Sequence, residues 1–409
     1  MEPLRIRREL RRRERRRRRA AIALVGCGLT LGLVWLAGWS EGPPAPRLPS
    51  LAVVAPPRVV PLPGARRRPP QFLVVSFDGS GGVRLWPYWR TVARRAHAHF
   101  TFFVSAAYLL DPAHSRLYHP PRHRAGASDI GFAFSEQGLQ PAQVVRGTLR
   151  QIARAAREGH EIGSHWVGHF CLGAPGNVSE WDAADWTQEL AQFDNLLFGA
   201  SRNMQIVPPI SLPFSPRAIV GERTPCLEGN LRTLYPVLRA HGYRYDASAV
   251  ALPNTWPKRV AGIWSLPLED MPLLEHGGQR VVTMDYNLFA LQTGARSARA
   301  SEAAALEAET YRTLWNAFRA RYYGSRAPFI YGNHFETWNH WAYDKALARF
   351  LVEACRLPEV RCGSYRELAD WLDAQPARRL ARYEAHRFPR LTAAQLHARS
   401  PSRVSRSRN

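Results

Sequence analysis

Short apolar runs alternate with longer amphipathic stretches over about 300 residues in the middle of this chain. The runs Phe72–Phe77 and Phe100–Val104 have the length and composition of buried strands. The stretch Pro141–Glu158 spaces its apolar residues at the period of a helix. Further strands are predicted at 161–165, 243–246, 262–266, 281–285 and 328–331, and further helices at 87–98, 181–198, 231–241, 302–322 and 344–354. Repeated strand–helix units favour an α/β fold, a distorted parallel barrel of the (β/α) type.

The N-terminal residues have the pattern of a membrane-targeting segment. Residues 1–19 hold eleven Arg and three Glu, and the next nineteen residues, Ala20–Gly38, contain no charged side chain. About 17–25 apolar residues suffice to cross a bilayer as a helix, and an arginine cluster marks the cytoplasmic side. We therefore expect one transmembrane anchor at 20–39 at the cell membrane, with the rest of the chain outside the cytoplasm. A cleaved signal peptide, which would leave a secreted protein, is the alternative.

Proline and arginine mark the two flanks of the central region. Residues 41–70 contain ten prolines, which favour an extended spacer over a helix. Residues 376–409 combine Arg, Ser, Ala and Pro with few apolar side chains after Leu391, so this basic tail is expected to be partly disordered. The folded domain is therefore expected at 71–375, between a linker at 40–70 and the tail.

The formal net charge of +23 is concentrated outside this domain. Residues 1–19 and 376–409 carry +8 each, and residues 40–70 carry +4, which leaves about +3 for the remainder. A nucleic-acid-binding domain usually carries its positive charge on a folded surface. The distribution of charge therefore argues against a nucleic-acid partner.

Four of the five cysteines lie within the expected domain, and Cys27 lies in the apolar N-terminal segment. An exported domain with an even number of cysteines can form two disulfides. The close pair Cys355 and Cys362 is one candidate bridge. Four free, buried thiols are the alternative.

Two polar patterns suited to hydrolytic chemistry occur where predicted strands end. Asp78 follows the first apolar strand and precedes the glycine-rich residues 79–82, the position of the catalytic rim in a barrel. An Asp-Gly pair also simply makes turns. His165 and His169 are four residues apart, so on one helical turn both imidazoles would face the same Zn²⁺. Two unrelated histidines are the alternative.

Two further segments could place charge at the same rim. Arg223 precedes a proline turn that ends at Cys226, and it could hold a fixed cation against a carboxylate. It could equally be a surface arginine before a turn. His334 ends the last predicted strand and could act as a general acid, or it could be a histidine satisfied within the core.

Taken in order, these segments resemble the motifs of the polysaccharide deacetylase family, the NodB-homology or chitin-deacetylase-like group known as carbohydrate esterase family 4. The matching segments are Ser76–Gly79, His99–Val104, Gly159–His169, Arg223–Cys226, Tyr243–Ser248 and His334. Met284–Asn287 and the region from Trp338 to Trp371 are similar to the chitin-deacetylase-like branch. The resemblance covers residues 71–375 and implies a NodB-like barrel.

The resemblance implies metal-dependent hydrolysis of N-acetyl groups, less often O-acetyl groups, from a sugar polymer. His165 and His169 would hold a divalent metal, foremost Zn²⁺, with Co²⁺ or Mn²⁺ as alternatives. Asp78 would be the general base, Arg223 would keep it ionised, and His334 would protonate the leaving amine.

The resemblance also implies contacts to the substrate. The backbone N–H of Cys226 would bind the oxyanion, and Asp285 and Trp338 would contact the substrate. The expected partner is an acetylated polysaccharide of the peptidoglycan or chitin-like kind. Several tryptophans could line a sugar groove, although burial in the core is the common role of such residues; they are Trp86, Trp89, Trp338 and Trp341.

The chain departs from the family pattern at two positions. Where the family has two aspartates, a base and then a metal ligand, this chain has one. If the segments are aligned on Phe77, Asp78 is the base and Gly79 takes the place of the metal ligand. If they are aligned on Gly79, Asp78 is the metal ligand. Zinc enzymes usually keep three protein ligands, so a carbohydrate-binding protein without full catalytic competence is the alternative function. Cys226 stands at the family's tyrosine position, and a bridge from Cys171 to Cys226 would tie the histidine segment to the oxyanion loop.

Overall fold

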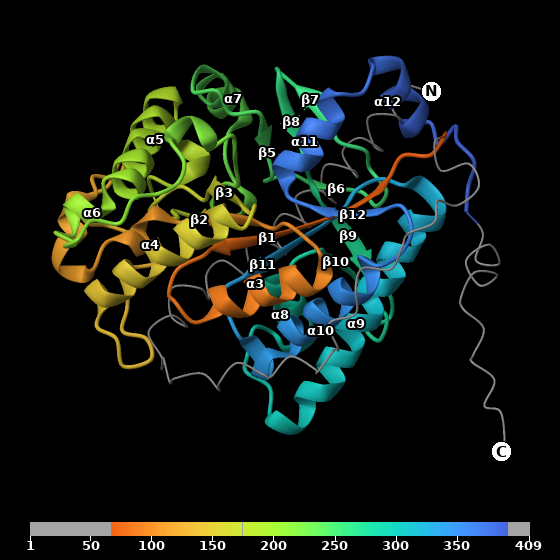
Figure 1. Ribbon diagram of the computed structural model, residues 1–409, viewed down its shortest axis with the longest axis horizontal. Coiled ribbons are helices and arrows are strands. Elements are labelled where there is room, and N and C mark those ends of the chain that lie inside the picture. The colour runs from red at the N-terminus through yellow and green to blue at the C-terminus, as the bar shows by residue number, and fades with distance from the viewer. Residues whose placement is uncertain (1–66, 174, 392–409) are drawn as a thin grey trace, which may run out of the picture.

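The computed structural model describes residues 67–173 and 175–391 (Figure 1). The predicted anchor at 20–39, nearly all of the linker at 40–70 and the end of the basic tail lie outside the described residues. Within the described ranges, no helix is both long and apolar enough to span a membrane.

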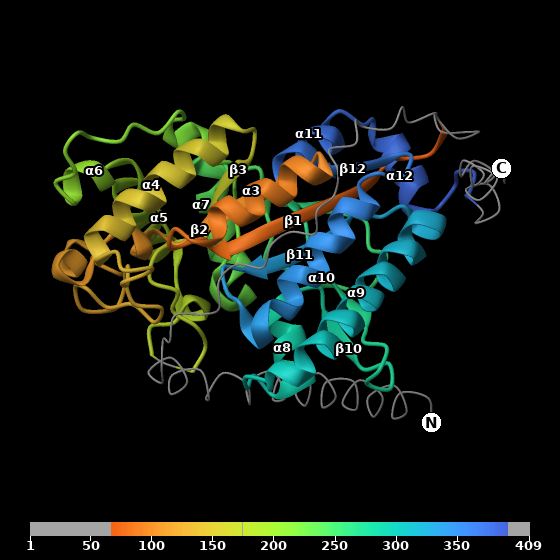
Figure 2. The same cartoon turned by 60° about the horizontal axis from the view of Figure 1, so that its bottom comes forward.

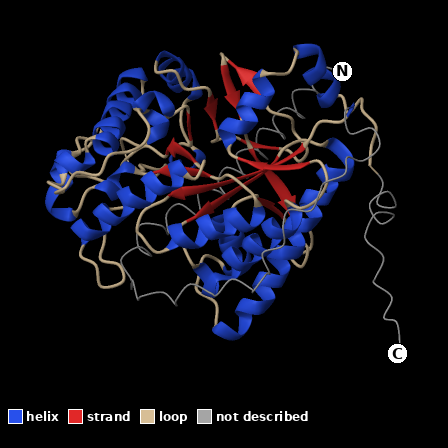
Figure 3. Cartoon of the chain, in the orientation of Figure 1, coloured by secondary structure: helices blue, strands red, loops and turns tan. Residues whose placement is uncertain are grey.

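A curled, mostly parallel sheet forms the centre of the fold (Figure 3). Its strands are β1 (Gln71–Gly79), β2 (Thr101–Val104), β3 (Glu161–Ser164), β4 (Gly221–Glu222), β5 (Tyr245–Asp246), β7 (Lys258–Val260), β8 (Ile263–Ser265), β11 (Phe329–His334) and β12 (Val360–Gly363). The strand order is β11-β1-β2-β3-β4-β5-β8-β7, and β12 pairs with the first residues of β1. Only the β7–β8 pair among these strands is antiparallel.

A second, smaller sheet continues the curl toward β11. Its strands are β6 (Val250–Ala251), β9 (Leu268–Pro272) and β10 (Arg280–Val282). Met284, just after β10, forms a single parallel bridge with Gly332 of β11. This bridge joins the smaller sheet to β11, and the described strands form a curled half-barrel and not a closed ring. The predicted α/β fold is confirmed, and the predicted distorted parallel barrel is confirmed in part, as a curled half-barrel.

Helices surround the sheet (Figures 1 and 3). They are α3 (Leu85–Ala96), α4 (Pro141–Arg157), α5 (Ala183–Phe198), α6 (Ala200–Asn203), α7 (Leu231–Ala240), α8 (Asp285–Thr293), α9 (Ala303–Ala320), α10 (Trp338–Ala354), α11 (Tyr365–Asp373) and α12 (Ala377–Glu384). Figure 2 shows α3 and α10 lying beside β1 and β11.

The alternation of side chains along β1 decides which residues reach the inside of the curled sheet. Leu73, Val75 and Phe77 join the core under the helices, where the Phe77 ring lies 4.5 Å from the ring of Trp89 on α3. The intervening residues Phe72 and Val74 join a second buried cluster on the other face. Because side chains alternate between faces along a strand, Ser76 and Asp78 point to this second, inner face.

The structure contains strands that the sequence did not predict, namely β4, β6, β7, β9 and β12, and it also differs from the expected elements elsewhere. The predicted strand at 281–285 ends at Val282, and Asp285 instead begins α8. Helix α10 begins at Trp338, but Asn339 and the next two residues have left-handed backbone angles, so its regular part starts close to the predicted position 344. The fold continues beyond residue 375, since Tyr383 of α12 packs on Trp256 with ring centres 5.6 Å apart. Helix α12 is basic, so the spacing of its few apolar side chains does not predict that it packs against the domain.

The close contact between β4 and β5 leads to a stability prediction. A Cβ atom at Gly221 would lie 1.8 Å from the ring of Tyr245. That ring cannot move aside easily, because it stacks on Tyr365 at 5.4 Å and its hydroxyl donates to Glu161 at 2.9 Å. We expect Gly221→Ala to lower the free energy of unfolding by about 1–3 kcal/mol or more, as measured by urea denaturation.

The matched control is Gly324→Ala, because a Cβ at Gly324 would meet no atom within 4 Å. This variant is expected to change the free energy of unfolding by no more than about 1 kcal/mol. Equal stability of the two variants would contradict the packing described for β4.

Candidate active site

Strands β11, β1, β3 and β4 of the main sheet bring the predicted polar residues to one edge. Asp78 of β1 is in register with His334 of β11. Ser164 of β3, which precedes His165, is in register with Glu222 of β4, which precedes Arg223. Because these strands are parallel, their carboxyl ends lie at the same edge, where active sites of such sheets form.

Arg223 is the centre of the hydrogen-bond network at this edge, and its side chain is fully buried. Its Nη1 donates to Asp78 Oδ1 at 2.8 Å and to Ser76 Oγ at 2.7 Å. Its Nε donates to the carbonyl oxygen of Ala247 at 3.0 Å, and its Nη2 donates to the hydroxyl of Tyr365. All three nitrogens of the guanidinium are therefore engaged, which fixes the cation in one orientation.

The Arg223 cation controls the protonation of Asp78. Burial by itself would raise the pKa of this carboxyl, but the adjacent guanidinium, together with His165 and His334, lowers the pKa below its ordinary value. Asp78 is therefore a carboxylate at neutral pH and is available to accept a proton.

His165 and His169 are neutral imidazoles. The Nδ1–H of His165 donates to the backbone carbonyl oxygen of Arg223 at 2.8 Å, which leaves the Nε2 lone pair free. Burial lowers the pKa of His165. Burial, together with His165 and His334, also lowers the pKa of His169 to about 3. Both rings therefore have the protonation state that a metal ligand needs.

The two imidazoles meet through a turn and not through a helix, so the helical expectation for this segment was wrong. Residues 165–170 contain no helix, and Trp166 and His169 have positive φ angles of 57° and 59°. The ring centres of His165 and His169 lie 5.0 Å apart. Two imidazoles bound to one tetrahedral Zn²⁺ with bonds of about 2.0 Å have ring centres about 5 Å apart. The separation of the ring centres therefore matches that of two histidines bound to one divalent ion.

Asp78 does not form a compact ligand set with these histidines. Among the described residues, one group of three potential ligands has all its donor atoms within 4.8 Å of one another, and it consists of His169, Cys171 and Cys226. The oxygen Oδ1 of Asp78 is instead bonded to Arg223. The structure thus places Asp78 as the partner of the guanidinium, and its role as a third metal ligand stays a prediction.

Glu189 of α5 holds the histidine turn, residues 165–170, in place through hydrogen bonds. Its buried carboxylate accepts the hydroxyl hydrogen of Tyr118 at 2.7 Å and the backbone N–H groups of Val167 and Gly168 at 3.2 and 3.3 Å. Burial raises the pKa of Glu189 to about 7. Sequence reasoning missed this residue, because an acid inside an amphipathic helix gives no local signal of such a contact.

His334 is paired with Asp285, and this pairing corrects the expected role of Asp285 as a substrate contact. Asp285 is 1% exposed. It accepts the Nδ1–H of His334 at 2.7 Å and the backbone N–H of His334 at 2.8 Å. Although burial alone would lower it, the negative charge of Asp285 raises the pKa of His334 to about 9. Asp285 therefore orients His334 and keeps it protonated.

Trp338 lies next to His334, as expected for a residue that borders the site. Its ring centre is 5.4 Å from that of His334, and it stacks on Phe289 with ring centres 5.1 Å apart. Trp338 is half-buried. Trp86, Trp89 and Trp341 are at most 1% exposed and belong to the core.

Glu336 is a further acid at this edge that sequence reasoning missed. Burial and the negative charge of Asp285 raise its pKa to about 7, against the opposing effect of His334. Its position two residues after a strand-ending histidine was the one signal available.

Both predicted disulfides are present. Cys171 is bonded to Cys226 across a sequence separation of 55, and Cys355 is bonded to Cys362. The first bridge ties the histidine turn to the loop after Arg223. Cys226 is exposed and has a positive φ of 53°. The contact expected between the backbone N–H of Cys226 and the oxyanion stays a prediction.

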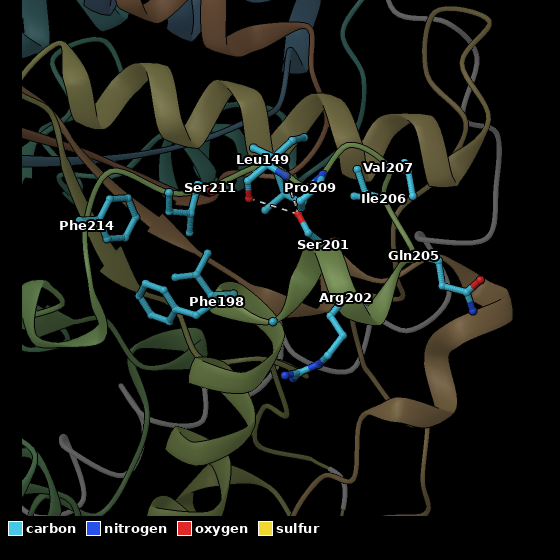
Figure 4. Close-up of a pocket in the computed structure, with 14 residues that line it drawn as sticks. Leu149, Phe198, Ser201, Arg202, Gln205, Ile206, Val207, Pro209, Ser211 and Phe214 are labelled. Carbon is cyan, nitrogen blue, oxygen red and sulfur yellow. Dashed lines mark hydrogen bonds between the residues drawn. The ribbon is translucent and has the colours of Figure 1, made fainter.

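A separate hollow of about 550 Å³ lies between α4 and the segment that follows α5 (Figure 4). It is lined mainly by apolar residues, among them Leu149, Phe198 and Phe214. Ser201 bonds to the backbone of Ile210 across it. None of the residues that line it belongs to the candidate active site.

Solved structures with a similar fold come from carbohydrate deacetylases and their relatives. No family model and no curated protein matches the sequence. A proposed polysaccharide deacetylase from Mycobacterium smegmatis is 16% identical, with a TM-score of 0.44, over 82% of this chain and 96% of that chain. A family 4 carbohydrate esterase from Streptomyces lividans is 12% identical, with a TM-score of 0.35, over 72% of this chain and 92% of that chain. A carbohydrate esterase family 4 pseudoenzyme from Bacillus anthracis is 9% identical, with a TM-score of 0.38, over 74% of this chain and 66% of that chain.

These structures carry the family name that the sequence motifs resemble. At these identities the likeness concerns the fold alone.

The His334–Asp285 pair leads to a prediction about protonation. The pKa of His334, about 9, should fall toward the ordinary histidine value near 6.5 in Asp285→Asn, because the negative charge is removed. The pair stabilises the folded protein fully below pH about 6.5, and this contribution is lost as the pH rises through about 9. Long-range ¹H–¹⁵N NMR of the histidine ring measures the pKa directly.

The control for this titration is Asp270→Asn, which changes an acid whose only ion-pair partner among the described residues is Arg280. It should leave the His334 titration unchanged. An unchanged His334 titration in Asp285→Asn would contradict the assigned role of Asp285.

Proposed function

We propose that this protein is a metal-dependent hydrolase that removes N-acetyl, or less often O-acetyl, groups from a polysaccharide. The observation that carries the proposal is a set of contacts at one sheet edge: Asp78 is bonded to Arg223, His165 to the backbone carbonyl of Arg223, and His334 to Asp285. Asp78 is held as a carboxylate, His165 and His169 are held neutral, and His334 is held protonated. A base, two metal ligands and an acid are the groups that metal-assisted amide hydrolysis needs.

His165 and His169 would hold the divalent ion, and Zn²⁺ is the first candidate, followed by Co²⁺ and Mn²⁺. Their free nitrogens and neutral state suit a borderline cation. When bound, such an ion supplies a Lewis acid for the acetyl carbonyl. The backbone carbonyl of Arg223 accepts the Nδ1–H of His165 and so orients the ring. Histidines that bind a metal usually have such a hydrogen-bond partner on the nitrogen that does not bind the metal.

Asp78 would accept a proton from the attacking water. Its bond to Arg223 keeps the carboxyl ionised and leaves it in one orientation. The backbone N–H of Cys226 would contribute to binding the oxyanion. His334 would then donate its Nε2 proton to the amine nitrogen as the C–N bond breaks, so that acetate and a free amino sugar leave the site.

The acetylated polysaccharide is proposed to be of the peptidoglycan or chitin-like kind. The half-buried ring of Trp338 beside His334 offers an apolar face of the sort on which sugar rings pack. We further propose that the domain acts outside the cytoplasm, held at the membrane by residues 20–39 or secreted after cleavage.

A carbohydrate-binding protein without turnover is the second candidate function. It is favoured by the single aspartate of the Phe77-Asp78-Gly79 segment and by the absence, among the described residues, of a compact set formed by Asp78 with both histidines. Such a protein would bind the same polymer at the same edge and release no acetate.

Acetate release from acetylated chitooligosaccharides and from peptidoglycan, with each of the three metals added in turn, tests the proposal. Asp78→Asn should lower the rate by at least about 100-fold, because it removes the general base. Chelation of the metal should abolish release, and addition of the metal should restore it. Asp370→Asn is the matched control, since Asp370 forms an exposed ion pair with Arg244 away from the site.

Release that persists in Asp78→Asn would overturn the mechanism. No release with any metal, together with retained oligosaccharide binding by calorimetry, would favour the second candidate function.

A further inference from the structure

His169, Cys171 and Cys226 form a compact cluster that the proposed hydrolysis does not use as a unit. Their donor atoms all lie within 4.8 Å of one another. The Nδ1 atom of His169 lies 3.4 Å from Sγ of Cys171. In the oxidised protein neither sulfur can bind an ion, because the two sulfurs are bonded to each other.

The cluster has the dimensions of a zinc site once the sulfurs are free. A tetrahedral Zn²⁺ with bonds of about 2.3 Å to sulfur and about 2.0 Å to nitrogen keeps neighbouring donor atoms about 3.5–3.8 Å apart. The observed distance of 3.4 Å between Nδ1 and Sγ already approaches this value. Cys226 is exposed and Cys171 is half-buried, so rotation of their side chains can separate the two sulfurs.

Other bonds keep the two cysteine segments together without the disulfide. The backbone N–H of Arg223 donates to the carbonyl oxygen of Ser164 at 3.0 Å, on one flank of the two segments. The backbone N–H of Leu172 donates to the carboxylate of Glu228 at 2.6 Å, on the other flank. Reduction therefore removes one link between segments that remain tied on both sides.

We propose that reduction of the Cys171–Cys226 disulfide creates a second metal site, in which His169, Cys171 and Cys226 bind a borderline divalent cation such as Zn²⁺. A dithiol reductant supplies the two electrons and is itself oxidised to a disulfide, and the protein gains two thiols. Binding of the cation then releases two protons, one from each thiol, and forms two metal–sulfur bonds and one metal–nitrogen bond.

His169 belongs to both metal sites but can serve only one at a time. A neutral imidazole has one nitrogen with a free lone pair, and its other nitrogen carries the hydrogen. In the oxidised protein the Nδ1–H faces Cys171, which leaves Nε2 for the pair with His165. In the reduced protein Nδ1 becomes a ligand of the thiolate site, and His165 loses its partner. The expected loss of hydrolysis on reduction rests on the proposed function, whereas the thiolate site does not.

Cobalt binding to the full-length protein tests the site, because Co²⁺ bound to thiolates absorbs in the near-ultraviolet. The protein is reduced with a phosphine and titrated with Co²⁺, and far-ultraviolet circular dichroism verifies that it stays folded. We expect the thiolate absorption only after reduction, saturating at about one ion per chain. The double variant Cys171→Ser/Cys226→Ser should lose it completely.

The second disulfide provides the matched control. The double variant Cys355→Ser/Cys362→Ser should keep the full absorption after reduction. His169→Gln should keep thiolate absorption but weaken Co²⁺ binding, because one of the three ligands is lost.

Three outcomes would overturn the proposal: no thiolate absorption from the reduced, folded protein, absorption that persists in Cys171→Ser/Cys226→Ser, or unfolding on reduction. The absorption can appear in a protein that releases no acetate in either redox state. In that case the proposed function fails and the thiolate site stands.

Discussion

The buried guanidinium of Arg223 is the interaction on which the rest of the active edge depends. A buried cation is costly unless it is paired and fully hydrogen-bonded, and Arg223 meets both conditions through Asp78, Ser76, Ala247 and Tyr365. The backbone carbonyl of the same residue fixes the ring of His165. One residue thus sets the ionisation of Asp78 and the tautomer of a candidate metal ligand.

The curled sheet provides what this network needs, because parallel strands deliver all their carboxyl ends to one edge. The inner face of β1 carries Ser76 and Asp78 toward Arg223, and the register of β11 sets His334 opposite Asp78. Asp285 then arrives from outside the main sheet, where the chain leaves β10 and begins α8. The base and the acid are therefore held by separate partners of opposite charge, which pushes their pKa values in opposite directions.

The longer apolar strands, the polar residues at their ends and the close pair Cys355–Cys362 could be predicted, because each leaves a local pattern in the chain. The short strands β4, β6, β7 and β9 leave none, and the bridge from Cys171 to Cys226 was suggested only by the resemblance to the family motifs. The contacts that determine protonation were not predictable in this way. Asp285 and His334 are 49 residues apart, and Glu189 reaches the histidine turn from helix α5. The turn itself depends on two left-handed residues, Trp166 and His169, although four-residue spacing indicates a helix. These contacts and backbone angles depend on tertiary packing, which the spacing of apolar residues along the chain does not reveal.

The backbone at the end of β1 suits the glycine that stands there in place of a second aspartate. Gly79 has a φ of +80°, and a Cβ at this position would already contact the ring of Tyr108 at 3.4 Å, so the strand ends in a turn that favours glycine. The histidine turn is further restrained by the bridge from Cys171 to Cys226. A bridge across 55 residues restricts the unfolded chain by about 4 kcal/mol in the chain-entropy account. The bridge thus restrains the histidine turn covalently, through its link to the loop that follows Arg223.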